Sequence, residues 1–166
     1  MEFKKLTFAM IKPDAVAAKN SGKIIDMIEQ NGFEIMRLQK VIISTELAEV
    51  FYGVHKERPF FGELVTFVTS APVIIMALYK DNAVESWREL IGATDPAKAA
   101  EGTIRKLFGT SVGNNAVHGS DSSETALTEL DLFFPDLFGF NDMSEENDEC
   151  CGDKDNCDED ECDDEC

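Results

Sequence analysis

Apolar residues along this chain fall into short continuous runs and into groups at helical spacing. Residues 6–11 (LTFAMI) and 73–79 (VIIMALY) are continuous runs of this kind, which predict buried strands. Residues 33–43 favour a strand by composition, and residues 116–118 are expected to form a brief one. Pro13 closely follows the first run, where its missing N–H would end a sheet ladder. A sheet of four strands is therefore predicted.

Helices are predicted between and after these strands, because apolar residues recur there every three or four positions. The expected helices cover residues 21–30, 44–54, 61–69 and 83–91, with a short helical piece near 96–100 and a last helix after residue 121.

The ends and faces of these helices follow from a few residues. Asn82 is expected to cap the helix that begins at residue 83. Asp121 and Glu124 have the spacing of a capping box, which would open the last helix. In the helix at 44–54, the expected apolar face consists of Leu47, Val50, Phe51 and Val54.

Strands and helices in this order predict an α+β protein with a ferredoxin-like, antiparallel four-stranded sheet covered by helices. The 166 residues of the chain leave room for one such domain with a hydrophobic core of its own. We expect that domain to occupy residues 1–140, and residues 141–166 to form a separate tail.

The acidic excess of the chain is concentrated in this tail. The whole chain has 15 basic and 33 acidic residues, a net charge of −18. Residues 141–166 hold fourteen of the acids and one of the bases, which leaves the remainder only mildly acidic. Apart from cysteine, Met143 is the one strongly apolar residue there, so the tail is predicted to be disordered.

All cysteines of the chain lie in the tail, at positions 150, 151, 157, 162 and 166. They could bind a soft metal, serve a redox role or help to dock a partner. Their spacings do not reproduce a C-x-x-C zinc pattern, which weakens the metal interpretation. A domain without cysteines is also unlike a secreted disulfide scaffold, so a cytoplasmic protein is expected.

Other classes of protein are disfavoured by composition. Residues 1–11 mix charges with apolar residues, unlike a signal peptide, and no apolar run approaches the length of a membrane span. We therefore expect no membrane association. The net negative charge argues against binding to nucleic acid.

The strongest candidate for chemistry is one histidine within a cluster of small polar residues. Residues 115–122 (NAVHGSDS) place His118 at the end of a predicted strand. Imidazole titrates near neutrality and can carry a phosphoryl group through a covalent intermediate. Such a site also needs a partner for the second ring nitrogen and cationic groups for the phosphate oxygens. Lys12, Arg88 and Arg105 are candidates for those cations.

Each of these residues also has a simpler interpretation. A lone histidine is more often a loop or core residue, and single basic side chains are most simply solvated charges. Tyr52 and Phe60 could be core or rim aromatics. The sequence contains no glycine-rich P-loop or dinucleotide motif, so a nucleotide would need another kind of site. The residue pattern by itself stops at a candidate site.

Several stretches together resemble the nucleoside diphosphate kinase family. Residues 115–121 are similar to its active-site signature, Asn-x-x-His-Gly-Ser-Asp. Further stretches occur in family order and spacing, namely residues 11–14 (IKPD), 58–61 (RPFF), 92–96 (GATDP) and 102–105 (GTIR). The resemblance covers about residues 6–135. It implies an enzyme that passes the γ-phosphate of ATP to a nucleoside diphosphate by a ping-pong mechanism, which maintains nucleotide pools.

The resemblance also implies a role for each matched residue. His118 resembles the phosphorylated nucleophile, oriented by Glu129 with support from Ser120. Tyr52 and Lys12 would lie near the transferring group. The nucleotide-binding set would be Lys12 and Asn115 at the ribose, Arg88, Thr94 and Arg105 at the phosphates, and Phe60 and Val112 at the base.

Family membership further implies a cofactor and an assembly. Mg²⁺ would bridge the phosphates, with no firm protein ligand, and the protein would be a homo-oligomer, either a tetramer or a hexamer. Two alternatives remain open: a scaffold that acts through its tail, and a histidine phosphatase or phosphocarrier. The complete set of matched site residues favours the kinase over both.

Overall fold

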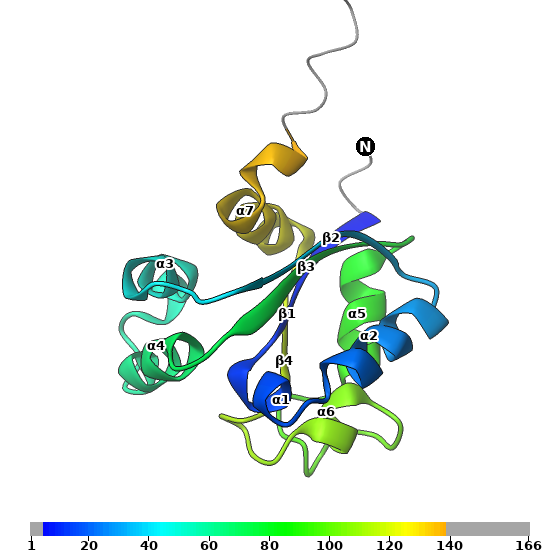
Figure 1. Cartoon of the computed structure of the whole chain (residues 1–166), viewed down its shortest axis with the longest axis horizontal. Coiled ribbons are helices and arrows are strands. Elements are labelled where there is room, and N and C mark those ends of the chain that lie inside the picture. Colours follow the sequence, from blue (N-terminus) through cyan, green and yellow to red (C-terminus); the bar gives the residue numbers. More distant parts are fainter. Residues whose placement is uncertain (1–4, 139–166) are drawn as a thin grey trace, which may run out of the picture.

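The computed structural model of the chain describes residues 5–138 and shows one antiparallel sheet with helices on both of its faces (Figure 1). The strands lie in the order β2-β3-β1-β4. Their bounds are β1 Leu6–Ile11, β2 Glu34–Val41, β3 Val73–Tyr79 and β4 Val117–Gly119. This order and the antiparallel pairing confirm the predicted ferredoxin-like sheet.

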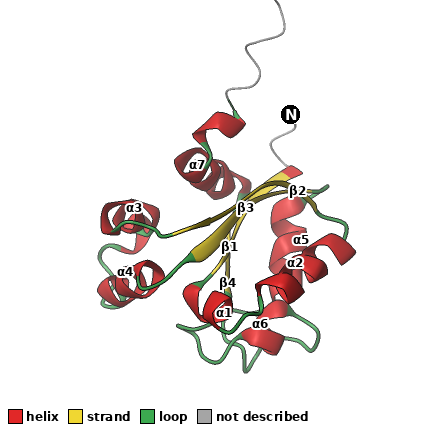
Figure 2. Cartoon of the chain, in the orientation of Figure 1, coloured by secondary structure: helices red, strands yellow, loops and turns green. Residues whose placement is uncertain are grey.

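The helices alternate with the strands along the chain (Figure 2). They are α1 Pro13–Ala17, α2 Ser21–Gln30, α3 Thr45–Phe51, α4 Phe61–Thr69, α5 Ala83–Ile91, α6 Ile104–Phe108 and α7 Ser123–Phe133, with 3-10 turns at η2 Gly53–His55 and η3 Pro135–Leu137. Within residues 5–138, none of these helices is long and apolar enough to cross a membrane.

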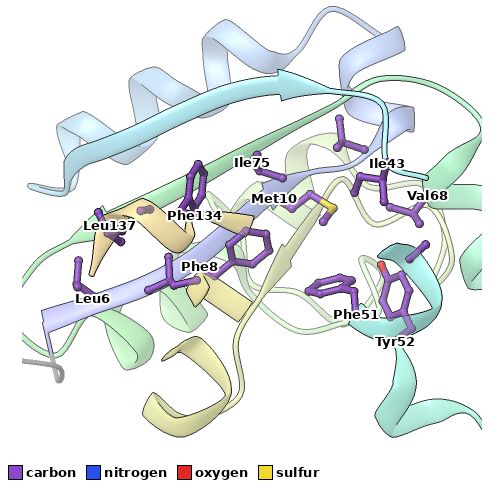
Figure 3. Packing of buried hydrophobic residues seen from close by; sticks show 14 of the residues in the cluster. Leu6, Phe8, Met10, Ile43, Phe51, Tyr52, Val68, Ile75, Phe134 and Leu137 are labelled. Carbon is purple, nitrogen blue, oxygen red and sulfur yellow. The ribbon is translucent and has the colours of Figure 1, made fainter. Parts of the chain in front are cut away.

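The central strands β1 and β3 are almost entirely apolar, with Thr7 as a buried polar residue of β1, because helices cover both faces of the sheet. Every residue of β1 is buried. Successive side chains of the strand point alternately into the two hydrophobic cores, one on each face of the sheet. Leu6, Phe8 and Met10 point toward α3, α4 and α7. Figure 3 shows Phe8 and Met10 near Phe51 and Ile75, and Leu6 near Leu137 at the other end of this core. The opposite face holds the side chains of α1, α2, α5 and α6. Continuous apolar runs are the expected sequence signature of strands covered on two sides.

The edge strand β4 brings the candidate histidine to the middle of the molecule. It is three residues long and pairs with the end of β1, so that His118 lies opposite Met10. The imidazole of His118 lies next to α7, the helix that packs on β1, and contacts Glu129 of that helix.

Several local predictions were wrong. The short helices α1 and α6 were not expected, and residues 96–100 form turns instead of a helix. Asn82 does not cap α5 with its side chain, because its backbone is left-handed with φ of 51°. The cap of α7 is Ser122, one residue after the predicted Asp121.

The predicted apolar face of the helix at 44–54 is also only partly buried. Phe51 is in the core, whereas Val50 and Val54 are 65% and 86% exposed. The α-helix ends at Phe51, and Val54 lies in the following 3-10 turn, where the helical spacing no longer applies. The predicted tail, residues 141–166, lies outside the described residues.

Candidate active site

The main chain of His118 is held on the side of the sheet that faces α5. The indole N–H of Trp87 donates a hydrogen bond to the His118 carbonyl oxygen at 3.2 Å. The next residue must be glycine for this approach, because a Cβ on Gly119 would lie 2.6 Å from Trp87 Nε1. Trp87 was not among the predicted site residues, and a tryptophan on the apolar face of a helix gives no signal of such a contact.

The imidazole of His118 points the other way, toward α7, where a carboxylate meets it. His118 Nε2 lies 2.9 Å from Glu129 Oε1, and the Ser120 hydroxyl donates to the second oxygen, Glu129 Oε2. Glu129 is 8% exposed, and Ser120 is fully buried. An ionised carboxylate can only accept hydrogen bonds, so Nε2 carries the proton and Nδ1 keeps its lone pair. This tautomer makes Nδ1 the nucleophilic nitrogen.

Aromatic side chains form the wall around this imidazole. The ring of Phe51 lies 4.9 Å from the His118 ring, and that of Phe8 lies 6.0 Å away. Tyr52 packs against Phe51 at 4.7 Å and is itself buried. Burial, with the nearby charge of Glu129, raises the pKa of the Tyr52 phenol, so its hydroxyl stays a hydrogen-bond donor at neutral pH.

Arg105 lies close enough to two other basic side chains, Lys12 and Arg88, for the positive charges to repel. Lys12 and Arg105 are 6% and 9% exposed. Burial and the positive charge of Arg105 lower the pKa of Lys12 to about 8, against an opposing contribution from Asp14. Burial and the charge of Arg88 lower the pKa of Arg105 to about 10, partly offset by Asp121. Neighbouring positive charges, two of them buried, are typical of a binding site for an anion.

Hydrogen bonds orient these cations. The Lys12 ammonium donates to Asn115 Oδ1 at 2.7 Å. Arg105 donates to the carbonyls of Gly92 and Val117 at 3.0 and 3.2 Å, while its buried Nε has no partner among the described residues. Arg88 is half-exposed and pairs with Asp121, a contact that the interpretation of Asp121 as a cap had missed.

The remaining predicted residues differ in how closely they are tied to this group. Asn115 also donates through its amide to the carbonyl of Thr94 at 3.2 Å, which ties the loop after α5 to the segment just before β4. Phe60 precedes α4 and Val112 lies in the loop before β4; they are 45% and 57% exposed. The structure therefore gathers His118, Glu129, Ser120, Tyr52 and the cations, and leaves the pair of Phe60 and Val112 as exposed apolar side chains.

The donor set of this site does not form a cage for a metal ion. Within residues 5–138, no group of three or more His, Cys, Asp or Glu side chains is placed to hold one. Mg²⁺ commonly keeps several waters and binds substrate phosphates with only one or two carboxylates. A cation carried by the substrate is compatible with these residues.

The fold and this site define an α+β protein in which a carboxylate binds one ring nitrogen of a histidine and basic side chains gather nearby. The family model described as nucleoside diphosphate kinase matches residues 5–137. The nucleoside diphosphate kinase of Geotalea daltonii is 56% identical over 131 residues, which cover 79% of this chain and 96% of that protein. That of Methylobacterium radiotolerans is 54% identical, with coverage of 78% and 93%.

Solved structures agree with these sequence matches. The Aquifex aeolicus nucleoside diphosphate kinase is similar with a TM-score of 0.78 and 43% identity, covering 80% of this chain and 96% of that one. A halophilic enzyme from Halobacterium salinarum, solved in complex with CDP, has a TM-score of 0.76 and 39% identity, with coverage of 79% and 88%. The chain belongs to the nucleoside diphosphate kinase family.

Proposed function

We propose that this protein transfers the γ-phosphoryl group of a nucleoside triphosphate such as ATP to a nucleoside diphosphate, through a phosphohistidine at His118. The observation that carries the proposal is the bond between His118 Nε2 and Glu129, together with the cations Lys12 and Arg88, whose charges both act on Arg105. Together they provide a nucleophile and a site for the phosphates that it would attack.

The transfer would take place in two steps. Nδ1 attacks the γ-phosphorus while the bond from that phosphorus to the β-phosphate oxygen breaks, and the electron pair leaves with the diphosphate. The proton stays on Nε2 throughout and donates a hydrogen bond to Glu129, whose second oxygen accepts from the Ser120 hydroxyl. A terminal oxygen of a second diphosphate then attacks phosphorus, and the electron pair of the P–N bond returns to Nδ1. This is a ping-pong mechanism.

The phosphates would be held by the cations and by neutral donors. Lys12, Arg88 and Arg105 would neutralise the phosphate oxygens, and relief of their mutual repulsion would favour binding. Thr94 would add a hydroxyl to this set. Tyr52, kept protonated by burial, would donate toward the transferring group.

The nucleoside would be bound with little selectivity for the base. We place the base between Phe60 and Val112, whose exposure leaves apolar surface for stacking. Every base has a π-face, so such a slot would accept purines and pyrimidines alike. Lys12 and Asn115, joined by their hydrogen bond, would contact the ribose.

We further propose that Mg²⁺ is the cation, carried by phosphate oxygens and water. When bound, it would neutralise charge that develops on the phosphates. The protein would act in the cytoplasm as a homo-oligomer, a tetramer or a hexamer.

The test uses full-length protein, γ-labelled ATP and Mg²⁺, followed by unlabelled GDP or CDP. The chain has two histidines, so His118→Ala has a matched control in His55→Ala. We expect an acid-labile label on the wild type and on His55→Ala that moves to the added diphosphate, and none on His118→Ala. Folded wild-type protein that takes up no label would overturn the proposal in favour of a scaffold role.

A further inference from the structure

A strained turn lies immediately before the strand that carries His118. Ala116 is fully buried and has φ of 67°, a left-handed conformation that is uncommon for a residue other than glycine. The Val117 N–H donates to the Asn115 carbonyl at 2.8 Å, which closes a three-residue turn around Ala116. A γ-turn with positive φ is rare and strained, and it persists only when neighbouring groups hold it.

Both main-chain polar groups of Ala116 are held by the segment that follows β1. Its carbonyl accepts from the Lys12 N–H at 2.8 Å. Its N–H donates to Asp14 Oδ2 at 3.0 Å, a contact between residues 102 positions apart in the chain. Asp14 thus supplies the side-chain acceptor for the Ala116 N–H, and it does so from the first turn of α1.

The turn fixes two groups of the proposed site at once. Asn115 precedes Ala116 and accepts from the Lys12 ammonium, while His118 follows it by two residues. A turn that relaxed would change the direction of the chain on both sides, because a buried γ-turn sets the relative orientation of its flanking residues. Asp14 Oδ2 accepts the hydrogen bond from the Ala116 N–H, and the other carboxylate oxygen, Oδ1, is buried without a partner among the described residues.

We propose that Asp14 is a positioning residue, whose hydrogen bond to the Ala116 N–H maintains the strained turn and thereby places both Asn115 and His118. The inference rests on the proposed phosphotransfer function. On this proposal, activity depends on the acceptor oxygen of residue 14 and not on its charge. Activity depends on Asp14 because the conformation of Ala116 is strained.

Asp14 could also affect activity through its charge, and the experiment has to separate this effect from that of the hydrogen bond. Its negative charge raises the pKa of Lys12, so loss of the charge would leave less of the Lys12 ammonium protonated. Asp14→Asn keeps an acceptor for the Ala116 N–H and removes the charge, whereas Asp14→Ala removes both. A comparison at about pH 6.5 keeps Lys12 largely charged in every variant.

The experiment measures His118 phosphorylation, kcat and KM per folded molecule in full-length Asp14→Ala, Asp14→Asn and Asp14→Ala/Ala116→Gly. Asp26→Ala is the matched control, since Asp26 is exposed on α2 and pairs only with Gln30 in its own helix among the described contacts. Hydrogen exchange at the Ala116 amide gives a readout that is independent of activity, so a failure of the proposed function can be distinguished from a failure of this inference.

We expect Asp14→Ala to exchange the Ala116 amide faster, to raise KM and to lower kcat, with kcat/KM reduced on the order of a hundredfold. Asp14→Asn should stay within a few-fold of wild type. Adding Ala116→Gly should restore most of the loss, because glycine enters this conformation without steric strain. Restored folding and activity in the double variant would also support the inference if Asp14→Ala alone does not fold.

Three results would overturn it. The first is wild-type kcat and KM per folded molecule in Asp14→Ala, as a merely structural role would give. The second is Asp14→Asn as impaired as Asp14→Ala, which would assign the effect to charge. The third is an Ala116 amide that remains protected without Asp14.

Discussion

At the scale of single residues, the chemistry of His118 is determined by which of its two nitrogens is already bound. Glu129 lies at hydrogen-bond distance from Nε2, and Ser120 holds the second carboxylate oxygen, so the carboxylate can neither rotate nor turn away. Both supporting groups are buried, which excludes water from competing for the imidazole N–H. The free electron pair is thereby assigned to Nδ1.

We therefore predict that Glu129→Gln lowers the rate of His118 phosphorylation by about a hundredfold, as misorientation of a catalytic group does. A glutamine amide can present either a donor or an acceptor to Nε2, so it does not select one tautomer. The measurement is rapid-quench labelling with γ-labelled ATP. Glu124→Gln, exposed on the same helix, is the control and should behave as wild type. Equal rates in the two variants would contradict the assigned role of Glu129.

The burial of Lys12 lowers the stability of the folded protein at neutral pH. Its ammonium is nearly buried beside Arg105, and its pKa is lowered to about 8. Between about pH 8 and the ordinary value of 10.5, the folded protein therefore binds fewer protons at Lys12 than the unfolded chain does. Linkage requires the contribution of Lys12 to the free energy of unfolding to rise with pH across that window.

The same pKa predicts the pH dependence of nucleotide binding. Below about pH 8 Lys12 is charged and can bind phosphate; above it the charge is lost, so KM for the nucleotide should rise toward tenfold per pH unit. Steady-state kinetics from pH 7 to pH 9.5 would measure this. Lys12→Gln should show a high KM that no longer changes through this region. A wild-type KM that stays constant up to pH 9.5 would refute the assignment.

At the scale of elements, helices and strands with a long periodic pattern were predictable, and those set by a few local contacts were not. The bounds of β1, β3, α2, α4 and α5 agree with the predicted ranges. By contrast, α1 and α6 have five residues each, too few to establish a helical period. Pro13 fits the first turn of a helix as well as the end of a strand, and sequence alone favoured the second reading.

The candidate site was predictable for a different reason. The family resemblance named His118, Glu129 and the cations, whereas residue patterns alone could not bring them together. Trp87 and Asp14 were missed because each acts on the main chain of a residue distant in sequence. Such contacts depend on the register of β4 beside β1, which no local pattern encodes.

The corrected cap of α7 gives a prediction for that helix. Ser122 accepts from the Thr125 N–H at 3.1 Å, so Ser122→Ala should lower the free energy of unfolding by about 1 kcal/mol. Urea unfolding would measure the change. Ser123→Ala, at the first residue of the helix, lacks this cap bond and should cost clearly less. Equal losses in the two variants would show that the cap at Ser122 does not stabilise α7.

At the scale of the whole molecule, the fold and the proposed site are contained in one sheet with its two helical layers. The family match ends at residue 137, and both hydrophobic cores lie within the described residues. The fourteen acids of residues 141–166 nevertheless account for most of the net charge of −18. Nucleotides are anions, so we expect this charge to slow their approach through long-range repulsion that salt screens.

We predict that deletion of residues 141–166 changes the free energy of unfolding by less than about 0.5 kcal/mol, as surface changes do. It should raise kcat/KM at low salt, with the gain disappearing near about 0.15 M salt, where the Debye length is about 8 Å. A variant with all five tail cysteines replaced by serine keeps the charge and should match wild type at every salt concentration. If that variant instead reproduces the deletion, the cysteines and not the charge are responsible, and zinc titration of the full chain becomes the deciding measurement. A large loss of stability on deletion would mean that residues 141–166 are part of the fold, because a solvated acidic segment has too little apolar surface to contribute one.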